Sequence, residues 1–319
     1  MKLFEVKKDK GRIKINFGGI KIQYTDYKKY YEQMCNTYRT QLNYLKEHVD
    51  VMTLKPASGV LRRFQLQTLD FVLKMLDFFK EQGWSYFLTG GNLLGAYRHS
   101  GFIPWDDDFD IGMMRKDFDA CDKYFSKNII NIENSDIRMT SLNLDKDRNT
   151  VINQFLKKYP NQLLYFRWYE HRQFFYGTSI DNFVQLDIFP YDFYSDDYDI
   201  DDHKNYLKNI QLKKNNISYN RKLIDFFEKK IATNINVVDK SNKIFYGIES
   251  SENVGNMNDQ TTFLNYDDVF PLRKIKYEYT ELYCANNPEK HLINLYGKNF
   301  MEFPDDIGYS HHLNNKEIL

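Results

Sequence analysis

The 319-residue chain has few cysteines and no net charge. Its three cysteines, Cys35, Cys121 and Cys284, lie far apart and are odd in number, which excludes both a disulfide framework and the spacing of a zinc site. We therefore expect reduced, structural thiols. Because 44 basic residues balance 44 acidic ones, the overall charge gives no indication of a nucleic-acid partner.

Long apolar runs are also lacking. No segment approaches the roughly 18 consecutive apolar residues of a membrane-spanning helix, and residues 1–17 do not contain the apolar core of a signal peptide. We expect a cytoplasmic protein without an integral membrane segment, peripheral at the inner face of the membrane if its acceptor is linked to lipid. Hydrophobic residues make up 42% of the chain, enough for a substantial core.

The most informative stretch is residues 86–112, YFLTGGNLLGAYRHSGFIPWDDDFDIG. A short apolar strand leads to Gly90 and Gly91, and Asn92 is expected to cap a helix over residues 93–98. A Gly-Gly break lets backbone N–H groups approach a bound anion closely, and a helix N-terminus favours phosphate. The sequence therefore predicts a phosphate-binding turn here.

Four aspartates follow within five residues: Asp106, Asp107, Asp108 and Asp110. Because successive side chains of a strand point to opposite faces, Asp108 and Asp110 share one face, while Phe109 points into a core. Asp106 shares the acidic face if the strand begins that early. Carboxylates at this spacing can converge on a hard cation, or on a pair of Mg²⁺ ions.

Two other structures are compatible with such an acidic run. A solvated loop is the ordinary one, but apolar residues alternate with the acids here. A calcium-binding loop matches at its first three ligand positions. However, its sixth position is Ile111 where Gly is needed, and its twelfth is Asp117 where Glu is needed. The alternation favours a strand that carries metal-binding carboxylates.

Residues 183–191, FVQLDIFPY, form a second informative strand. Asp187 lies among apolar residues, and such an acid is costly unless it is paired, hydrogen-bonded or bound to a metal. The sequence leaves two roles open for Asp187: a buried carboxylate held by hydrogen bonds, or a metal ligand. The segment before this strand carries three basic side chains that are either phosphate contacts or ordinary surface or packing residues: Arg167, His171 and Arg172.

The same periodicities predict further elements. An acidic segment, residues 192–202, is expected to be a solvated loop. A β-hairpin is expected over 3–24, with turns at 9–11 and 18–19, and two strands within 269–284. Helices are expected over 26–49, 60–81 (ending at Gly83), 118–127 (capped by Asp117) and 203–231. A last helix is capped by Asn287, with Pro288 at its first position and Gly297 just past its end.

The segment GGNLLGAYRHSGFIPWDDDFDIG, residues 90–112, resembles the signature of the LicD family, which includes the fukutin-related proteins. The resemblance extends over roughly residues 60–112, 183–191 and 266–312. Asn92 is one departure, because many members have Thr or Ser there. The resemblance implies an α+β fold of the nucleotidyltransferase type, a mixed sheet flanked by helices. We expect this domain to cover residues 56–319, after an N-terminal hairpin and helix in residues 1–55.

The resemblance also implies a reaction: metal-dependent transfer of a phosphorylated alcohol from a CDP-linked donor to a sugar hydroxyl of a surface glycan or its precursor. The acceptor can be lipid-linked. Asp108, Asp110 and Asp187 are the implied catalytic residues and metal ligands, with Mg²⁺ as the cofactor or Mn²⁺ in its place. Either Asp187 or Asp106 would take the proton of the acceptor hydroxyl. The substrate-binding candidates are Gly90, Gly91, Asn92, Arg98, His99, Asp106 and Asp107.

Three other functions stay open. An Asp-x-Asp glycosyltransferase also holds a nucleotide diphosphate through a metal, but it needs neither the Gly-Gly turn nor a third strand carboxylate. A true nucleotidyltransferase would consume CTP and release pyrophosphate. A non-catalytic member would bind a glycan or a partner protein, and the intact acids argue against it. The transferred alcohol is open among choline, ribitol, glycerol and others.

Overall fold

The computed structural model describes residues 4–9, 12–17, 20–25, 27–127, 129–132, 140–142, 150–159, 161–168, 171–179, 182–214, 221–250, 257 and 260–304. The chain divides into two compact units, formed mainly by residues 1–53 and by residues 54–301.

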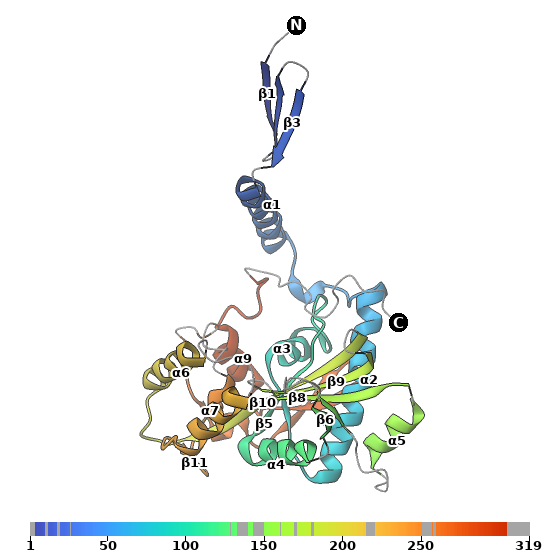
Figure 1. The fold of residues 1–319 in the computed structure, drawn as a ribbon. Helices are drawn as coiled ribbons and strands as arrows, with labels where there is room; N and C mark the ends of the chain where they lie inside the picture. The colour runs from blue at the N-terminus through green and yellow to red at the C-terminus, as the bar shows by residue number, and fades with distance from the viewer. Residues whose placement is uncertain are drawn as a thin grey trace. The chain divides into compact units, whose positions relative to one another are not determined.

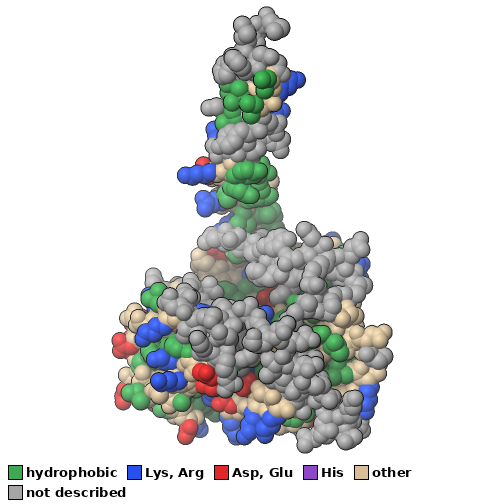
Figure 2. Space-filling model, viewed as in Figure 1, with side chains coloured by type: hydrophobic (Ala, Val, Ile, Leu, Met, Phe, Trp, Pro, Cys, Tyr) green, Lys and Arg blue, Asp and Glu red, His purple; other side chains and the backbone are tan. Residues whose placement is uncertain are grey.

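The first unit contains a small sheet and one long helix (Figure 1). Three antiparallel strands pair in chain order: β1 (Phe4–Asp9), β2 (Arg12–Phe17) and β3 (Ile20–Thr25). The predicted hairpin thus has a third strand, and the connections at residues 10–11 and 18–19 lie outside the described residues. Helix α1 (Tyr27–His48) confirms the predicted helix. It buries none of its side chains, and Figure 2 shows hydrophobic ones along it.

The second unit is built on a mixed sheet whose central strand is β10 (Asn182–Tyr194). One part of β10 pairs antiparallel with β9 (Arg172–Ser179), and its C-terminal end pairs antiparallel with β12 (Lys243–Tyr246). In between, β10 pairs parallel with β5 (Asp110–Met114), which in turn pairs antiparallel with β4 (Phe87–Leu88). Helices flank this sheet (Figure 1), so the predicted α+β mixed-sheet fold is confirmed.

The remaining elements surround these strands. The helices are η1 (Val51–Thr53), α2 (Gly59–Gln82), α3 (Gly90–His99), α4 (Arg115–Ser126), α5 (Val151–Lys158), α6 (Ile200–Lys214), α7 (Arg221–Ala232), α8 (Tyr266–Val269) and α9 (Pro288–Tyr296). The other strands are β6 (Ile129–Ile132), β7 (Thr140–Leu142), β8 (Leu163–Trp168), β11 (Val237–Val238), β13 (Leu264–Asn265), and the hairpin β14 (Arg273–Tyr277) and β15 (Thr280–Cys284).

Helix α2 supplies much of the core. Its apolar positions recur at helical spacing, and residues such as Phe71, Val72, Met75 and Phe79 are at most 1% exposed. The helix ends at Gly83, whose φ of 75° is the left-handed conformation that favours glycine at this position. The predicted helix and its stop are therefore confirmed, as are the hairpin β14–β15 and helix α9 with its cap.

Three sequence predictions are wrong in detail. Helix α3 begins at Gly90 rather than Leu93, so Asn92 lies inside the helix and is not its cap. Helix α4 begins at Arg115, and Asp117 instead accepts a hydrogen bond from the backbone N–H of Ser85 (3.0 Å). In both cases local capping rules assign the side chain to a helix terminus, but it forms a hydrogen bond with a backbone N–H group outside the helix instead.

The acidic segment 192–202 is the third correction. Its first three residues continue strand β10, and Asp192 is 1% exposed because Arg115 pairs with it. Helices α6 and α7 lie within the range of the helix predicted over 203–231, and residues 215–220 between them lie outside the described residues. No helix in the described part of the chain is both long and apolar enough to cross a membrane. Basic and acidic side chains are interspersed on the face of the second unit seen in Figure 2.

Candidate functional site

The sheet brings two of the predicted acids together from distant parts of the sequence. Asp110 is the first residue of β5, and its Cα partner in the parallel strand β10 is Asp187. Paired residues of adjacent strands project to the same face. Phe109 and Ile111 are fully buried on the opposite face. The predicted alternation is confirmed for Asp110 and Ile111, and the strand begins only at Asp110. That Asp108 shares the face of Asp110 stays a prediction.

Asp106 and Asp108 lie close together in the loop before β5. Burial, the charge of Asp108, a hydrogen bond to Asp108 and the charge of Asp107 raise the pKa of Asp106 well above its ordinary value. Asp107 is only 3% exposed. The loop therefore holds carboxyl groups close enough to repel one another when both are ionised.

The N-terminus of helix α3 lies directly against these acids. Gly90 has a φ of +55°, and a Cβ atom there would lie 2.7 Å from Oδ2 of Asp110. A Cβ atom at Gly91 would lie 2.5 Å from Oδ2 of Asp106. A side chain at either position would displace a carboxylate oxygen. The positive end of the helix dipole also favours negative charge at this place.

Asn92 fastens helix α3 to the start of strand β5. It is 1% exposed; its Oδ1 accepts a hydrogen bond from the backbone N–H of Asp110 (2.5 Å), and its Nδ2 donates to the hydroxyl of Tyr277 (2.9 Å). The amide is thus used inside the protein. Asn92 was predicted as a substrate contact, but its side chain holds the backbone of Asp110 in position.

Arg98 and His99 lie at the other end of the ten-residue helix α3, about 12 Å along the axis from Gly90 at 1.5 Å per residue. Arg98 is 6% exposed, and burial lowers its pKa. Burial also lowers the pKa of His99, as does the charge of Arg98. The structure does not place these two residues at the glycine turn.

Asp187 is surrounded by donors from its own strand and its neighbour. Nε2 of Gln185 donates to Oδ1 of Asp187 (2.5 Å), and Nε2 of Gln173 lies 3.2 Å from the same oxygen. Nε2 of His171 is 3.3 Å from Oδ2, and its ring stacks on Phe189. Asp187 is 8% exposed. Of the three basic residues left open by the sequence, His171 contacts a predicted site acid, and Arg172 pairs with Asp122.

A tyrosine near the acids was not anticipated from the sequence. Desolvation, the neighbouring Tyr246 and then the charges of Asp110, Asp106 and Asp108 raise the pKa of Tyr296 well above its ordinary value. Tyr296 is the last residue of α9, a helix that packs beside α3. Its sequence signal is weak, because tyrosine is abundant in this chain and the acids are far from it in sequence.

The acidic loop is also held from the side of helix α2. Gln65, fully buried, donates from Nε2 to the carbonyl oxygens of Ile103 (3.2 Å) and Asp106 (2.8 Å). Arg62 forms a bidentate pair with Glu278 at the tip of the β14–β15 hairpin (2.8 and 2.5 Å). The sequence contains a signal for this role of Gln65, because a polar residue on the buried face of an apolar helix needs hydrogen-bond partners inside the protein.

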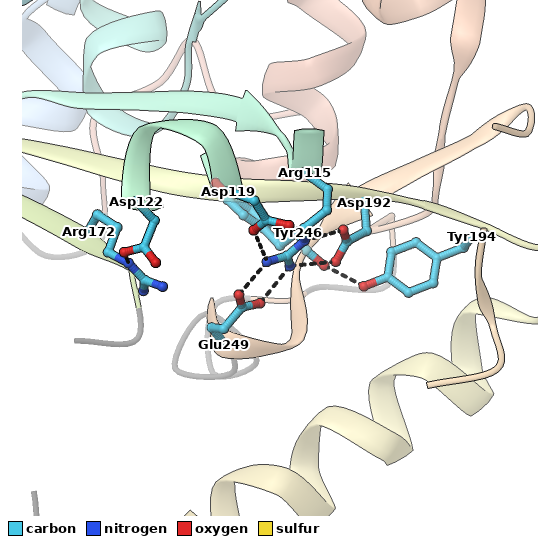
Figure 3. A network of polar contacts seen from close by, with 8 residues as sticks. All are labelled: Arg115, Asp119, Asp122, Arg172, Asp192, Tyr194, Tyr246 and Glu249. Carbon is cyan, nitrogen blue, oxygen red and sulfur yellow. Dashed lines mark hydrogen bonds and ion pairs between the residues drawn. The ribbon is translucent and has the colours of Figure 1, made fainter. Parts of the chain in front are cut away.

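A second polar network lies around Arg115, just after strand β5 (Figure 3). Its guanidinium makes bidentate hydrogen bonds to Asp192 of β10 (2.7 and 2.8 Å) and to Glu249 (2.6 and 2.8 Å). Burial by itself would raise the pKa of Glu249, but the charge and hydrogen bonds of Arg115 outweigh it and lower the pKa. Arg115 thus ties β5 and β10 together on the face of the sheet opposite Asp187.

The chemistry of the acids suits a divalent cation. Crowded carboxylates such as Asp106 and Asp108 either share a proton or bind a cation, and carboxylate oxygens are the ligands that Mg²⁺ prefers. Asp110 adjoins them through the glycine turn. In the described part of the chain, no three His, Cys, Asp or Glu side chains are gathered tightly enough to enclose a metal ion. The donor set fits by its chemistry, while a closed coordination shell would need side chains to turn.

Comparison with known proteins points to one family. Residues 83–233 match the family model described as LicD/FKTN/FKRP, nucleotidyltransferase domain. The chain is similar to the lipopolysaccharide cholinephosphotransferase LicD of Haemophilus influenzae, with 50% identity over 50 residues, 14% of this chain and 19% of that protein.

It is also similar to the ribitol 5-phosphate transferase FKRP of Homo sapiens, with 40% identity over 57 residues, 18% of this chain and 11% of that protein. An uncharacterized protein of Rickettsia prowazekii is 59% identical over 32 residues, 10% of this chain and 12% of that protein. The matches thus span less than a fifth of the length of these relatives.

Proposed function

We propose, from the premise that residues 83–233 form a nucleotidyltransferase domain of the LicD family, that this protein transfers a phosphorylated alcohol from a CDP-linked donor to a sugar hydroxyl of a glycan. The pairing of Asp110 with Asp187 across parallel strands carries the proposal, because it joins the two acidic motifs in one place. The names of two relatives, a cholinephosphotransferase and a ribitol 5-phosphate transferase, support the reaction type.

The proposed cofactor is Mg²⁺, or Mn²⁺ in its place, with Asp108, Asp110 and Asp187 as its ligands. When bound, the metal would neutralise charge on the donor diphosphate and in the transition state. The crowding of Asp106 against Asp108 supports this part, because a cation relieves the repulsion between them.

The chain's own groups have distinct roles in this proposal. Backbone N–H groups at Gly90 and Gly91 bind a phosphate oxygen at the positive end of helix α3. Asn92 keeps Asp110 in position through the Asp110 N–H. The acceptor hydroxyl loses its proton to a carboxylate, either Asp187 or Asp106, as it attacks the phosphorus, and CMP leaves. The reaction is proposed for the cytoplasm, at the inner face of the membrane when the acceptor is lipid-linked.

Donor binding measured by calorimetry tests the proposal. CDP-choline, CDP-ribitol, CDP-glycerol, CTP and a UDP-sugar are titrated into the full chain with and without Mg²⁺. We expect one CDP-alcohol to bind tightly, only with the metal, and its affinity to fall at least about 100-fold in Asp108→Asn and in Asp110→Asn, each of which removes a charged ligand.

The matched control is Asp201→Asn, because the Asp201 side chain is 82% exposed on helix α6. This variant should bind the donor as the wild type does. A preference for the UDP-sugar would replace the proposal with a glycosyltransferase, and pyrophosphate release from CTP would replace it with a nucleotidyltransferase. Binding of no nucleotide would overturn it in favour of a non-catalytic role.

A further inference from the structure

A large pocket lies away from the acidic loop. Its volume is about 930 Å³, and it is lined by the C-terminal half of helix α2, the segment that leads into β4, helix α8 with the residues after it, and the hairpin β14–β15. None of the residues predicted as catalytic or substrate-binding lines it. This volume is at the upper end of the range for ligand-binding pockets, so there is space for more than a single small metabolite.

The pocket wall combines aromatic rings with charged side chains. Trp84, Tyr86 and Tyr283 line the pocket, and the rings of Tyr86 and Tyr283 meet edge to face with centroids 5.8 Å apart. Tyr283 is 42% exposed, so its ring is available to a ligand. Trp84 is held by rings of the core, including Phe78 at 5.9 Å.

The charges in the wall nearly cancel. Three carboxylates and two ammonium groups line the pocket: Asp77, Asp267, Glu281, Lys80 and Lys274. Lys274 and Glu281 approach each other to 3.9 Å, both more than half exposed, so they are available to a ligand as well as to one another. Such a wall offers both hydrogen-bond donors and acceptors. A ligand with hydroxyl groups can use both, because each hydroxyl donates and accepts hydrogen bonds.

Other ligand classes fit this wall poorly. Helix α2 ends at the pocket with Gly83, and a helix C-terminus carries partial negative charge. With one more acid than base and no arginine among the lining residues, the pocket disfavours a nucleotide or another phosphorylated ligand. A purely apolar ligand would take water away from five charged groups and offer them no hydrogen bonds in return. A neutral ligand with many hydroxyl groups and apolar ring faces satisfies both parts of the wall.

We propose that this pocket binds a neutral oligosaccharide segment, with Tyr283 against a sugar ring and Glu281 hydrogen-bonded to its hydroxyl groups. This rests on the proposed function, in which such a segment belongs to the acceptor glycan. The hairpin β14–β15 connects the pocket to the site, because Tyr277 on the same hairpin binds Asn92 beside the acids. The pocket then selects the glycan, while the acidic loop handles the donor.

A printed array of neutral oligosaccharides, probed with the full chain without donor or metal, tests this inference. The best-bound oligosaccharide is then titrated by calorimetry into Tyr283→Ala and Glu281→Gln. We expect each variant to lose affinity about ten-fold, which corresponds to about 1.4 kcal/mol. Both residues are exposed, and an unchanged thermal unfolding midpoint confirms that the variants are folded.

Tyr279→Ala is the matched control, because Tyr279 lies at the turn of the same hairpin, is 65% exposed and does not line the pocket. It should bind the oligosaccharide as the wild type does. No binding anywhere on the array, or equal losses in Tyr279→Ala and Tyr283→Ala, would overturn the pocket proposal. CDP-alcohol binding by the wild-type chain separates the two ideas: donor binding without glycan binding rejects only the pocket, and glycan binding without donor binding rejects only the proposed function.

Discussion

Single residues decide how closely helix α3 can approach the acids. Gly90 and Gly83 both have positive φ, but they differ in their surroundings. A Cβ atom at Gly90 would collide with Asp110, whereas one at Gly83 would have no atom within 4 Å. Substitution at Gly83 therefore causes backbone strain alone, whereas substitution at Gly90 causes strain and also displaces a site carboxylate.

We expect Gly90→Ala to lower donor affinity at least about ten-fold and to lower the free energy of unfolding by about 1–3 kcal/mol. Gly83→Ala should cost about 1 kcal/mol of stability through strain and leave donor affinity unchanged. Calorimetry and urea unfolding of both variants test this. Equal donor affinities in the two variants would contradict the close packing of helix α3 on Asp110.

A buried histidine should make stability depend on pH. His203 lies among aromatic rings, including those of Tyr194 and Phe245, and neither of its ring nitrogens has a hydrogen-bond partner within the described ranges. Burial lowers its pKa to about 3. Below pH 6.5 the unfolded chain therefore binds a proton that the folded chain does not, and stability falls as the pH falls.

This histidine should cost roughly 2 kcal/mol of stability between pH 6.5 and pH 5. In His203→Phe, which keeps an aromatic ring in place, the loss over this range should be smaller by that amount. Part of the pH dependence should persist, because burial also lowers the pKa of His291, to about 4. Urea unfolding at the two pH values measures this. An unchanged pH dependence in His203→Phe would contradict it.

At the scale of elements, β5 and β10 form the framework of the site. Their parallel pairing aligns Asp110 with Asp187 on one face. On the other face, Arg115 binds Asp192 and Glu249, two carboxylates whose side chains are 2% and 0% exposed. Without this guanidinium, two buried negative charges would have lost their main partner, and that cost exceeds the gain from a surface ion pair.

Arg115→Ala should therefore reduce the free energy of unfolding by about 3–5 kcal/mol. Lys116→Ala, at the next and exposed position of helix α4, should stay within about 0.5 kcal/mol of the wild type. Urea unfolding of both variants at pH 7 measures the difference. A loss in Arg115→Ala as small as that in Lys116→Ala would mean that this network does not hold the two strands together.

At the scale of the whole molecule, the core belongs to the second unit. Among the residues whose burial the structure describes, all buried hydrophobic ones except Val51 and Phe303 lie in the second unit, and helix α1 buries none. We expect a chain that begins at Leu54 to unfold cooperatively, with a midpoint within about 4 °C of the full chain, the shift that corresponds to about 1 kcal/mol in a domain of this size.

The truncated chain should also bind the same donor with unchanged affinity, as calorimetry can measure. A broad, non-cooperative transition would show that the second unit needs the first for its folding. Cooperative unfolding with loss of donor binding would show that the first unit contributes to the site.

The sequence by itself determined the parts of this protein that depend on local order. The spacing of apolar residues predicted helix α2, terminal signals at Asn287, Pro288 and Gly297 predicted helix α9, and alternation predicted strand β10 and the burial of Phe109. The ordered motif at residues 90–112 indicated the family, which the match over residues 83–233 supports. These features follow from neighbouring residues and from the 3.6- and 2-residue periods.

Tertiary structure alone decided which distant residues meet. Capping rules assigned Asn92 and Asp117 to helix termini, but Asn92 binds strand β5 and Asp117 binds the Ser85 backbone. An acidic run predicted a solvated loop, but Arg115 makes it favourable to bury Asp192. Tyr296, on a helix near the C-terminus, lies close enough to the acids for their charges to raise its pKa. A polar side chain binds whatever partner the fold brings within about 3 Å, and no local pattern contains that information.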